Sequence, residues 1–193
     1  MSEKKRCPWC LGSDAYKAYH DDEWGHPQHD DAVLFEFLIL EGAQAGLSWS
    51  TILNKRDGYR RIFAEFDPVK LSRWTDARLE KALLDPGIVR NRLKVWSVRT
   101  NAKAFLKTQQ EFGSFDAYLW KWVSGKTVQN QWKEMAEVPA RTELSDQISK
   151  DLIKRGFKFV GSTIIYAYLQ AMGVVNDHLQ DCHRYPRHKI RRS

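Results

Sequence analysis

Residues 145–173 read SDQISKDLIKRGFKFVGSTIIYAYLQAMG, and this stretch decides the predicted fold. Ile148 and Leu152 lie four residues apart, as on the apolar face of a helix, and the basic residues that follow suit the negative end of a helix dipole. Ser162 is a residue type that caps a new helix. Because the segment between the two helices is too short for anything but a turn, the sequence predicts a helix-hairpin-helix over about residues 145–172.

The turn of this hairpin is a candidate phosphate-binding site. The backbone N–H groups from Gly161 to Thr163 open the second helix, where such donors are unpaired and suit a phosphate group. A glycine allows close approach, and Lys158 supplies nearby positive charge. Lys158, Gly161, Ser162 and Thr163 are therefore the candidate DNA-binding residues, although the same pattern is as often a purely structural αα-hairpin.

The remaining apolar residues also follow mostly helical spacing, so we expect an all-α fold. A length of 193 residues fits a single domain, residues 1–193. Three cysteines give no even disulfide framework, the start shows no signal-peptide pattern, and no apolar run approaches a membrane span. We expect an intracellular, cytoplasmic protein without a targeting signal and without membrane association.

A helix opened by Asp30 and Asp31 carries an acid on its apolar face. Leu34 and Leu38 lie on that face, and the next matching position is Glu41. A carboxylate there is usually a satisfied structural partner, but it is also typical of a functional acid in a partly dry pocket.

Two further helices are expected. Ser48 fits the N-cap of one helix that continues through Ile52 and Tyr59 toward Pro68. A tight turn containing Pro86 then leads into a basic helix.

The charge of the chain favours an anionic partner. The formal net charge is +7 and the sequence contains eight tryptophans, which stack on nucleic-acid bases where they are not needed for core packing. The basic residues near the end strengthen the nucleic-acid interpretation only modestly; they are Arg184, Arg187, Lys189, Arg191 and Arg192.

Two Cys/His pairs at opposite ends of the chain form a complete set of soft metal ligands. They are Cys7 with His20 and His178 with Cys182, and the last two residues would share one face of a helix. Cys10 is an alternative to Cys7, because C-x-x-C is also a zinc spacing. A redox role for this C-x-x-C pair is disfavoured, since no strand precedes it, and the histidines could also be ordinary surface residues.

A zinc ion bound by four protein ligands has no open coordination position and stabilises a fold rather than catalysing a reaction. We therefore predict one structural zinc per chain that ties the terminal segments, residues 1–25 and 174–193, to each other.

Several motifs resemble those of the 3-methyladenine DNA glycosylase I family, within the helix-hairpin-helix glycosylases. They extend over nearly the whole chain and are Arg6-Cys7-x-Trp9, Ala18-Tyr19-His20-Asp21-x-Glu23-Trp24-Gly25, Leu40-Glu41-Gly42-x-Gln44-Ala45-Gly46-Leu47-Ser48-Trp49, Gly87-Ile88-Val89-Arg90-Asn91-Arg92, Arg155-Gly156-Phe157-Lys158-Phe159-Val160-Gly161 and Val175-Asn176-Asp177-His178. The resemblance implies a mainly α-helical, monomeric enzyme with a structural zinc, and it selects Cys7 over Cys10 as the first ligand.

The resemblance also assigns roles to pocket residues. By analogy Glu41 lies in the base pocket as the recognition residue with a possible catalytic share, and Trp9, Tyr19 and Trp49 form the aromatic wall around the extruded base. Asn176 falls where many relatives in the wider superfamily carry a catalytic aspartate, and Phe159 replaces the first glycine of their hairpin.

The implied function is monofunctional, hydrolytic removal of 3-methyladenine from double-stranded DNA that contains alkylated bases, in base-excision repair. A base inside a duplex must first be flipped out, and aromatic faces recover part of the unstacking energy. The alternative is a zinc-stabilised module that binds damaged nucleic acid without catalysis.

Overall fold

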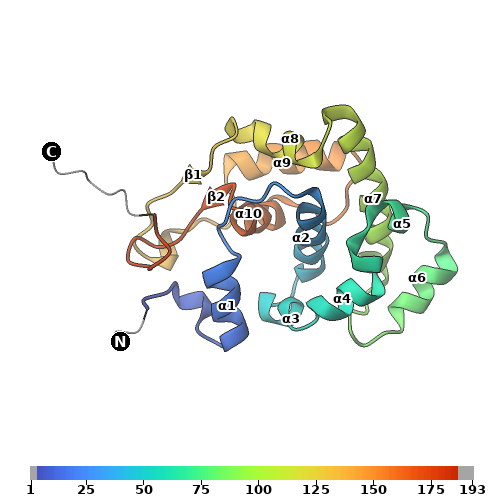
Figure 1. The fold of residues 1–193 in the computed structure, drawn as a ribbon, viewed down its shortest axis with the longest axis horizontal. Coiled ribbons are helices and arrows are strands. Elements are labelled where there is room, and N and C mark those ends of the chain that lie inside the picture. Colours follow the sequence, from blue (N-terminus) through green and yellow to red (C-terminus); the bar gives the residue numbers. More distant parts are fainter. Residues whose placement is uncertain (1–3, 187–193) are drawn as a thin grey trace.

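The computed structural model describes residues 4–186 and is almost entirely α-helical, which confirms the predicted fold class (Figure 1). The α-helices are α1 (Asp14–Asp22), α2 (Asp31–Gln44), α3 (Trp49–Leu53), α4 (Arg56–Ile62), α5 (Pro68–Ser72), α6 (Asp76–Leu83), α7 (Arg92–Phe112), α8 (Phe115–Trp120), α9 (Glu143–Lys154) and α10 (Ser162–Ala171). Four short 3₁₀ turns are η1 (Pro8–Cys10), η2 (Ala64–Phe66), η3 (Lys121–Val123) and η4 (Met135–Glu137).

Two short parallel strands, β1 (Val128–Gln129) and β2 (Val175–Asn176), join the segment after α8 to the segment after α10. Val128 pairs with Val175, so the chain on either side of β2 is held against the loop that precedes α9. This loop and the end of the described chain therefore lie next to each other, and both approach the N-terminal segment (Figure 1).

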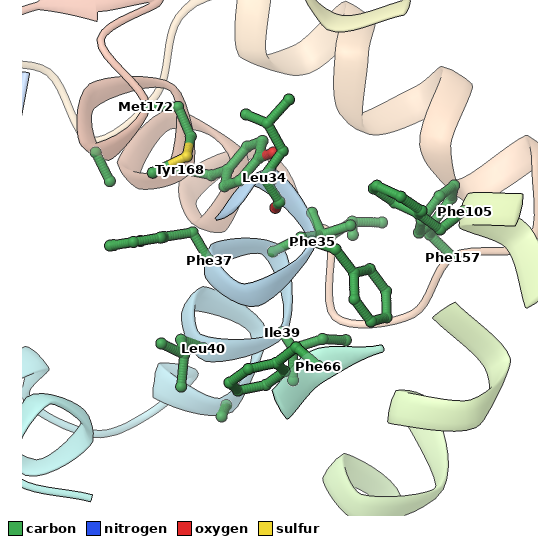
Figure 2. Packing of buried hydrophobic residues seen from close by; sticks show 14 of the residues in the cluster. Leu34, Phe35, Phe37, Ile39, Leu40, Phe66, Phe105, Phe157, Tyr168 and Met172 are labelled. Carbon is green, nitrogen blue, oxygen red and sulfur yellow. Dashed lines mark hydrogen bonds between the residues drawn. The ribbon is translucent and has the colours of Figure 1, made fainter. Parts of the chain in front are cut away.

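The helix α2 lies in the middle of the molecule and is buried on nearly every side (Figure 1). Its side chains leave the helix in several directions and meet residues from distant segments (Figure 2). The ring of Phe35 lies 4.7 Å from that of Phe105 on α7, and the hydroxyl of Tyr168 on α10 donates to the carbonyl of Leu34 at 3.0 Å. A helix that is apolar all round is stable only when it is enclosed in this way.

The two helices of the predicted helix-hairpin-helix, α9 and α10, pack together, and the hairpin between them is held by α7. The buried amide of Asn101 on α7 accepts from the N–H of Lys158 at 2.8 Å and donates to the carbonyl of the same residue at 3.0 Å. Phe159 has a φ of +56°, in the left-handed region that costs a non-glycine residue about 1 kcal/mol or more. Asn101 thus holds the hairpin in a shape that its own sequence does not favour.

Three local predictions were wrong. Ser162 is not the cap of α10 but its first residue, and its hydroxyl pairs with that of Ser145 at 2.8 Å, so the cap position falls on Gly161. The helix predicted from Ser48 toward Pro68 is broken at Asn54, a residue type of low helix propensity.

The third wrong prediction concerns His178 and Cys182, which do not lie on a helix. The segment that carries them is a turn, in which the N–H of Cys182 donates to the carbonyl of Leu179 at 2.8 Å. A tight turn brings the two side chains together as well as a helical face does.

Among residues 4–186, no helix is long and apolar enough to cross a membrane. The basic residues Arg187, Lys189, Arg191 and Arg192 lie outside the described residues, whereas Arg184 is within them and its guanidinium contacts the ring of His26.

Gly173 is a position where the fold requires glycine. Its φ is +65°, and a Cβ there would lie 2.3 Å from the carbonyl carbon of His26. We expect Gly173→Ala to lower the free energy of unfolding by about 3 kcal/mol or more, because a backbone clash is added to the strain of the left-handed conformation. Gly113→Ala is the matched control: φ is +87° but nothing lies within 4 Å of the new Cβ, so only about 1 kcal/mol should be lost. Equal losses in urea unfolding would contradict this account.

Candidate active site and metal cluster

A cavity of about 320 Å³ opens between α1, the end of α2, the start of α3 and α10. Its volume is in the range of small-molecule binding sites. The four residues that the sequence assigned to the base pocket all line this cavity: Trp9, Tyr19, Glu41 and Trp49. Residues far apart in the sequence are therefore brought together at one place.

Aromatic rings come from six of the sixteen residues that line the cavity. Tyr19 and Trp49 lie 5.3 Å apart between ring centroids, and Trp9 lies 4.9 Å from Trp24 and 5.1 Å from Tyr16. Flat, rigid faces at these distances suit a planar ligand, which can stack on one ring and contact the edges of the others. Tyr16 precedes Tyr19 by one helical turn of α1, so the two residues share a face.

Glu41 is the unusual group of the cavity. Its side chain is 3 % exposed, and its Oε2 atom is buried without a hydrogen-bond partner among the described residues. Burial raises the pKa of Glu41 to about 8, because a charged carboxylate loses its hydration there. In the empty cavity at neutral pH this carboxyl is therefore mostly protonated. The indole N–H of Trp49 is also buried without a partner, so two polar groups of the wall are left for a ligand.

A half-buried arginine, Arg56, supports the aromatic wall on the side away from the cavity. Arg56 on α4 binds Glu23 and Glu36, each at 2.6 Å, and its guanidinium lies 4.8 Å from the ring of Phe37. Phe37 in turn stacks on Trp49 at 6.1 Å between centroids. These contacts join the end of α1 to α2 and α4, and so they fix the width of the cavity between Tyr19 on α1 and Glu41 on α2.

The sequence did not reveal several residues of the cavity. They come from five segments and are Tyr16, Trp24, Gln44, Met135, Val138, Pro139, Ala140, Tyr166, Ala167, Gln170 and Asp177. Thr163 also lines the cavity, although the sequence indicated it only as a DNA-binding residue. Asp177 is buried and its carboxylate accepts from four neutral donors, among them the hydroxyl of Tyr166 at 2.5 Å and the amide of Gln170 at 2.7 Å. The period of α10 could have indicated Tyr166 and Gln170, which lie four residues apart, but the approach of residues 135–140 is a tertiary contact.

The predicted metal ligands converge at the ends of the described chain. The ligand atoms of Cys7, His20, His178 and Cys182 all lie within 4.8 Å of one another, and all four residues are buried. The Sγ atom of Cys182 lies 3.5 Å from Nε2 of His20 and 3.7 Å from Nδ1 of His178. The ligands of a tetrahedral zinc ion are separated by about 3.5 Å, given bonds of about 2.0 Å to nitrogen and 2.3 Å to sulfur. The four residues could therefore hold a metal ion.

Neighbouring groups orient the two imidazoles of this cluster. The second ring nitrogen of His20 lies 2.8 Å from the carboxylate of Asp21, and that of His178 lies 3.2 Å from the carbonyl of Trp24. Such outer contacts are typical of histidines that bind metals. Cys10 is not part of the cluster, because its thiol donates to the carbonyl of Cys7 at 3.1 Å.

The predicted DNA-binding residues surround the start of α10, next to the cavity. Lys158, Gly161 and Thr163 are exposed and Ser162 is half-buried. Thr163 also lines the cavity, so the hairpin and the cavity share one edge. Because the cap position is Gly161, no side chain caps the first N–H groups of α10.

An aromatic cavity that holds a buried acid is typical of enzymes that act on a base extruded from DNA. The model of the methyladenine glycosylase family matches residues 9–185, nearly the whole chain. This protein therefore belongs to the methyladenine glycosylase family.

Individual relatives match this chain over all or nearly all of their length. The chain is 45 % identical to DNA-3-methyladenine glycosylase 1 of Escherichia coli, covering 96 % of this chain and 99 % of the relative. It is 44 % identical to DNA-3-methyladenine glycosylase of Haemophilus influenzae, covering 92 % and 96 %. Among solved structures, 3-methyladenine DNA glycosylase I of Staphylococcus aureus superposes with a TM-score of 0.92 at 35 % identity, covering 97 % of this chain and all of that chain.

The burial of Glu41 should make the free energy of unfolding depend on pH. Its ordinary pKa is 4.5 and its folded value is about 8, so the folded protein retains a proton that the unfolded chain releases in this interval. Wild-type stability should therefore fall as the pH rises through that window, by up to about 1.4 kcal/mol per pH unit. The glutamine of Glu41→Gln does not titrate. As the pH rises through the window, the free energy of unfolding of this variant should therefore increase relative to that of wild type by the same amount.

Urea unfolding at several pH values between these limits measures this difference. Glu65→Gln, at an exposed position, is the control for the loss of a carboxyl group. A constant difference between Glu41→Gln and wild type would mean that Glu41 is ionised throughout.

Proposed function

We propose that this protein removes 3-methyladenine from double-stranded DNA that contains alkylated bases, by hydrolysis of the N-glycosidic bond. The observation that supports this most directly is the buried carboxyl of Glu41, which has no partner and faces an aromatic cavity. A structure similar to this one, with a TM-score of 0.91 at 36 % identity, is that of a 3-methyladenine DNA glycosylase I variant in complex with 3-methyladenine.

The charge of the substrate explains the residue types in the cavity. Methylation at N3 makes adenine in DNA cationic, and a cation is attracted to aromatic faces and to a carboxylate. Trp9, Tyr19 and Trp49 supply the faces, and Glu41 accepts hydrogen bonds from the edge of the base. A normal, neutral base gains no such charge interaction with the buried acid, so the cavity discriminates against it.

The cationic base is also a good leaving group, and the chemical step therefore needs little help from a general acid. We propose that water attacks the sugar as the glycosidic bond breaks, without a covalent enzyme intermediate. The bonding electrons leave with the cationic base, which departs as neutral 3-methyladenine, and the attacking water gives up one proton to the solvent. Entry of the cationic base favours loss of the proton of Glu41, and the resulting carboxylate stabilises the positive charge. Asn176 is not among the residues that line the cavity, and its side chain accepts from the N–H of His178 at 3.1 Å. The carboxylate of Glu41 is therefore the proposed catalytic group, and it acts by stabilising positive charge.

The hairpin would hold the duplex while the base is in the cavity. The first N–H groups of α10, from Ser162 and Thr163, are available to a backbone phosphate, and Lys158 adds positive charge. We propose that the enzyme acts as a monomer in the cytoplasm, on duplex DNA whose lesion base is flipped out.

We propose further that the metal is zinc, that one ion binds per chain, and that its role is structural. Cys7, His20, His178 and Cys182 would hold it, and two thiolates with two imidazoles are a ligand set typical of zinc. When bound, the ion cross-links the N-terminal segment to the segment after β2. With four protein ligands it would have no position for a water nucleophile.

A zinc-stabilised module that only binds damaged nucleic acid is disfavoured. A surface that binds phosphates has no use for a protonated carboxyl buried in an aromatic cavity, because such a group opposes anion binding once it is ionised. The cavity therefore favours the enzyme.

The purified protein should release 3-methyladenine from methylated duplex DNA and leave abasic sites without strand cleavage. Chromatographic identification of the free base, together with gel analysis of the DNA, measures both products. Trp49→Ala should lower kcat/KM at least about tenfold, because loss of an aromatic stack costs about 1–3 kcal/mol per base. Trp122→Ala removes a half-buried tryptophan outside the cavity and is the control. Folded protein that binds DNA but releases no base would contradict the proposed glycosylase activity.

Cys182→Ala should abolish stoichiometric zinc binding and lower the free energy of unfolding by several kcal/mol, since the binding energy of a structural metal contributes to folding. Cys10→Ala removes another buried cysteine that lies outside the cluster, and it should keep its zinc. Elemental analysis and thermal unfolding of the three proteins provide the test. Wild-type protein prepared without chelators that contains no zinc would rule out the structural zinc.

A further inference from the structure

The longest helix, α7, carries an unusual distribution of charge. From residue 92 to residue 110 it has five cations and no acid, and its first acidic residue is Glu111. A solvated helix normally carries both signs of charge, since opposite charges one turn apart stabilise it. A helix surface of one sign is instead typical of a surface that meets opposite charge.

The cations in the first half of α7 already have partners. Arg92 binds Glu80, Arg99 binds Asp76 at 2.7 Å, and the ammonium of Lys94 donates to two carbonyl groups at the end of α2. In the second half, Lys103 and Lys107 are exposed, and neither pairs with any residue in the range 4–186. These two lysines are therefore available to an external anion.

Lys103 and Lys107 border the hairpin. Together with Arg155 and Gly156, they line a shallow hollow between α7 and the start of the hairpin. Lys154, at the end of α9, is exposed and lines the neighbouring hollow with Lys107. The two acids at this end, Glu111 and Asp151, share Arg155 as a partner, at 2.7 and 2.6 Å, so one of their two negative charges is balanced.

Asn101 fixes the position of this lysine surface relative to the hairpin. It lies on α7 half a turn before Lys103, and its side chain holds both backbone polar groups of Lys158, as described above. The hairpin and α7 therefore form one rigid unit, and a phosphate bound at the hairpin has a fixed position relative to the lysines. Lys103 and Lys107 are separated by about 6 Å along the helix, on the scale of neighbouring phosphates of one strand.

We propose that Lys103, Lys107 and Lys154 form a second phosphate-binding surface, which binds the backbone of duplex DNA where it continues past the hairpin, away from the flipped base. The inference rests on the proposed function in that its ligand is duplex DNA. An acidic protein would also be attracted to three lysines, but the continuity with the hairpin and the register held by Asn101 favour DNA.

The test compares DNA binding by wild type and by the double variant Lys103→Gln/Lys107→Gln. The DNA is a duplex of normal bases that carries one stable abasic-site analogue. The analogue lies near the 5′ end of its strand in one duplex and near the 3′ end in the other, so that DNA extends past the hairpin in only one of them. The logarithm of the association constant is measured against the logarithm of the salt concentration. For the duplex that extends past the hairpin, the slope of the double variant should be less steep than that of wild type by about 2. Each lost phosphate contact removes about 0.9 from the magnitude of the slope. The other duplex should give the wild-type slope.

Lys70→Gln/Lys81→Gln removes the same charge from exposed positions on α5 and α6 and should keep the wild-type slope in both duplexes. The inference is overturned if the Lys103/Lys107 variant keeps the wild-type slope in both duplexes, or if it and the control lose equally. Base release from methylated DNA by wild type, measured alongside, tests the proposed function separately: release with an unchanged slope refutes only the lysine surface, and a changed slope without release refutes only the excision of 3-methyladenine.

Discussion

The enclosure of α2 is the constraint on which the rest of the structure depends. A helix with Phe35, Phe37, Ile39 and Leu40 on different faces must be surrounded, and α3, α7, α8 and α10 all pack against it. Enclosure extends to its last turn, where Glu41 takes a position that an apolar residue would otherwise occupy. The fold therefore removes water from a carboxyl group whose Oε2 atom has no partner among residues 4–186, and a ligand can supply one.

The Cys/His cluster lies beside a helix, α1, that is weakly attached to the rest of the fold. The helix α1 has only nine residues and few contacts with the rest of the fold, yet it carries Tyr19 in the cavity wall. The next residue, His20, is one of the four clustered ligands, so a bound metal would fix α1 within one residue of the wall. Arg56 binds Glu23, the residue that follows the same helix, three residues after His20. Two separate attachments thus set the cavity width that α1 alone could not maintain.

The sequence predicted what depends on local pattern. Helical spacing indicated α2, α9 and α10, and it identified Glu41 as an acid on an apolar face before any contact was known. It failed where long-range contacts overrule local preference. Ser162 is a good cap residue, but its hydroxyl is used by Ser145 on α9, and the turn at His178 satisfies the cluster without a helix. The approach of Pro139 and its neighbours to the cavity has no local signal at all, because it depends on how β1 pairs with β2.

Attraction to DNA and selection of a lesion make opposite electrostatic demands on this chain. A net charge of +7 attracts any duplex, damaged or not, and so it cannot distinguish one base from another. Selection must come from a negative group, but an ionised carboxylate at the surface would repel the phosphates. Burial resolves the conflict, because it keeps Glu41 mostly protonated while the cavity is empty. In the proposed function a cationic base favours the carboxylate, so the charge that recognises the lesion forms mainly when the lesion is bound.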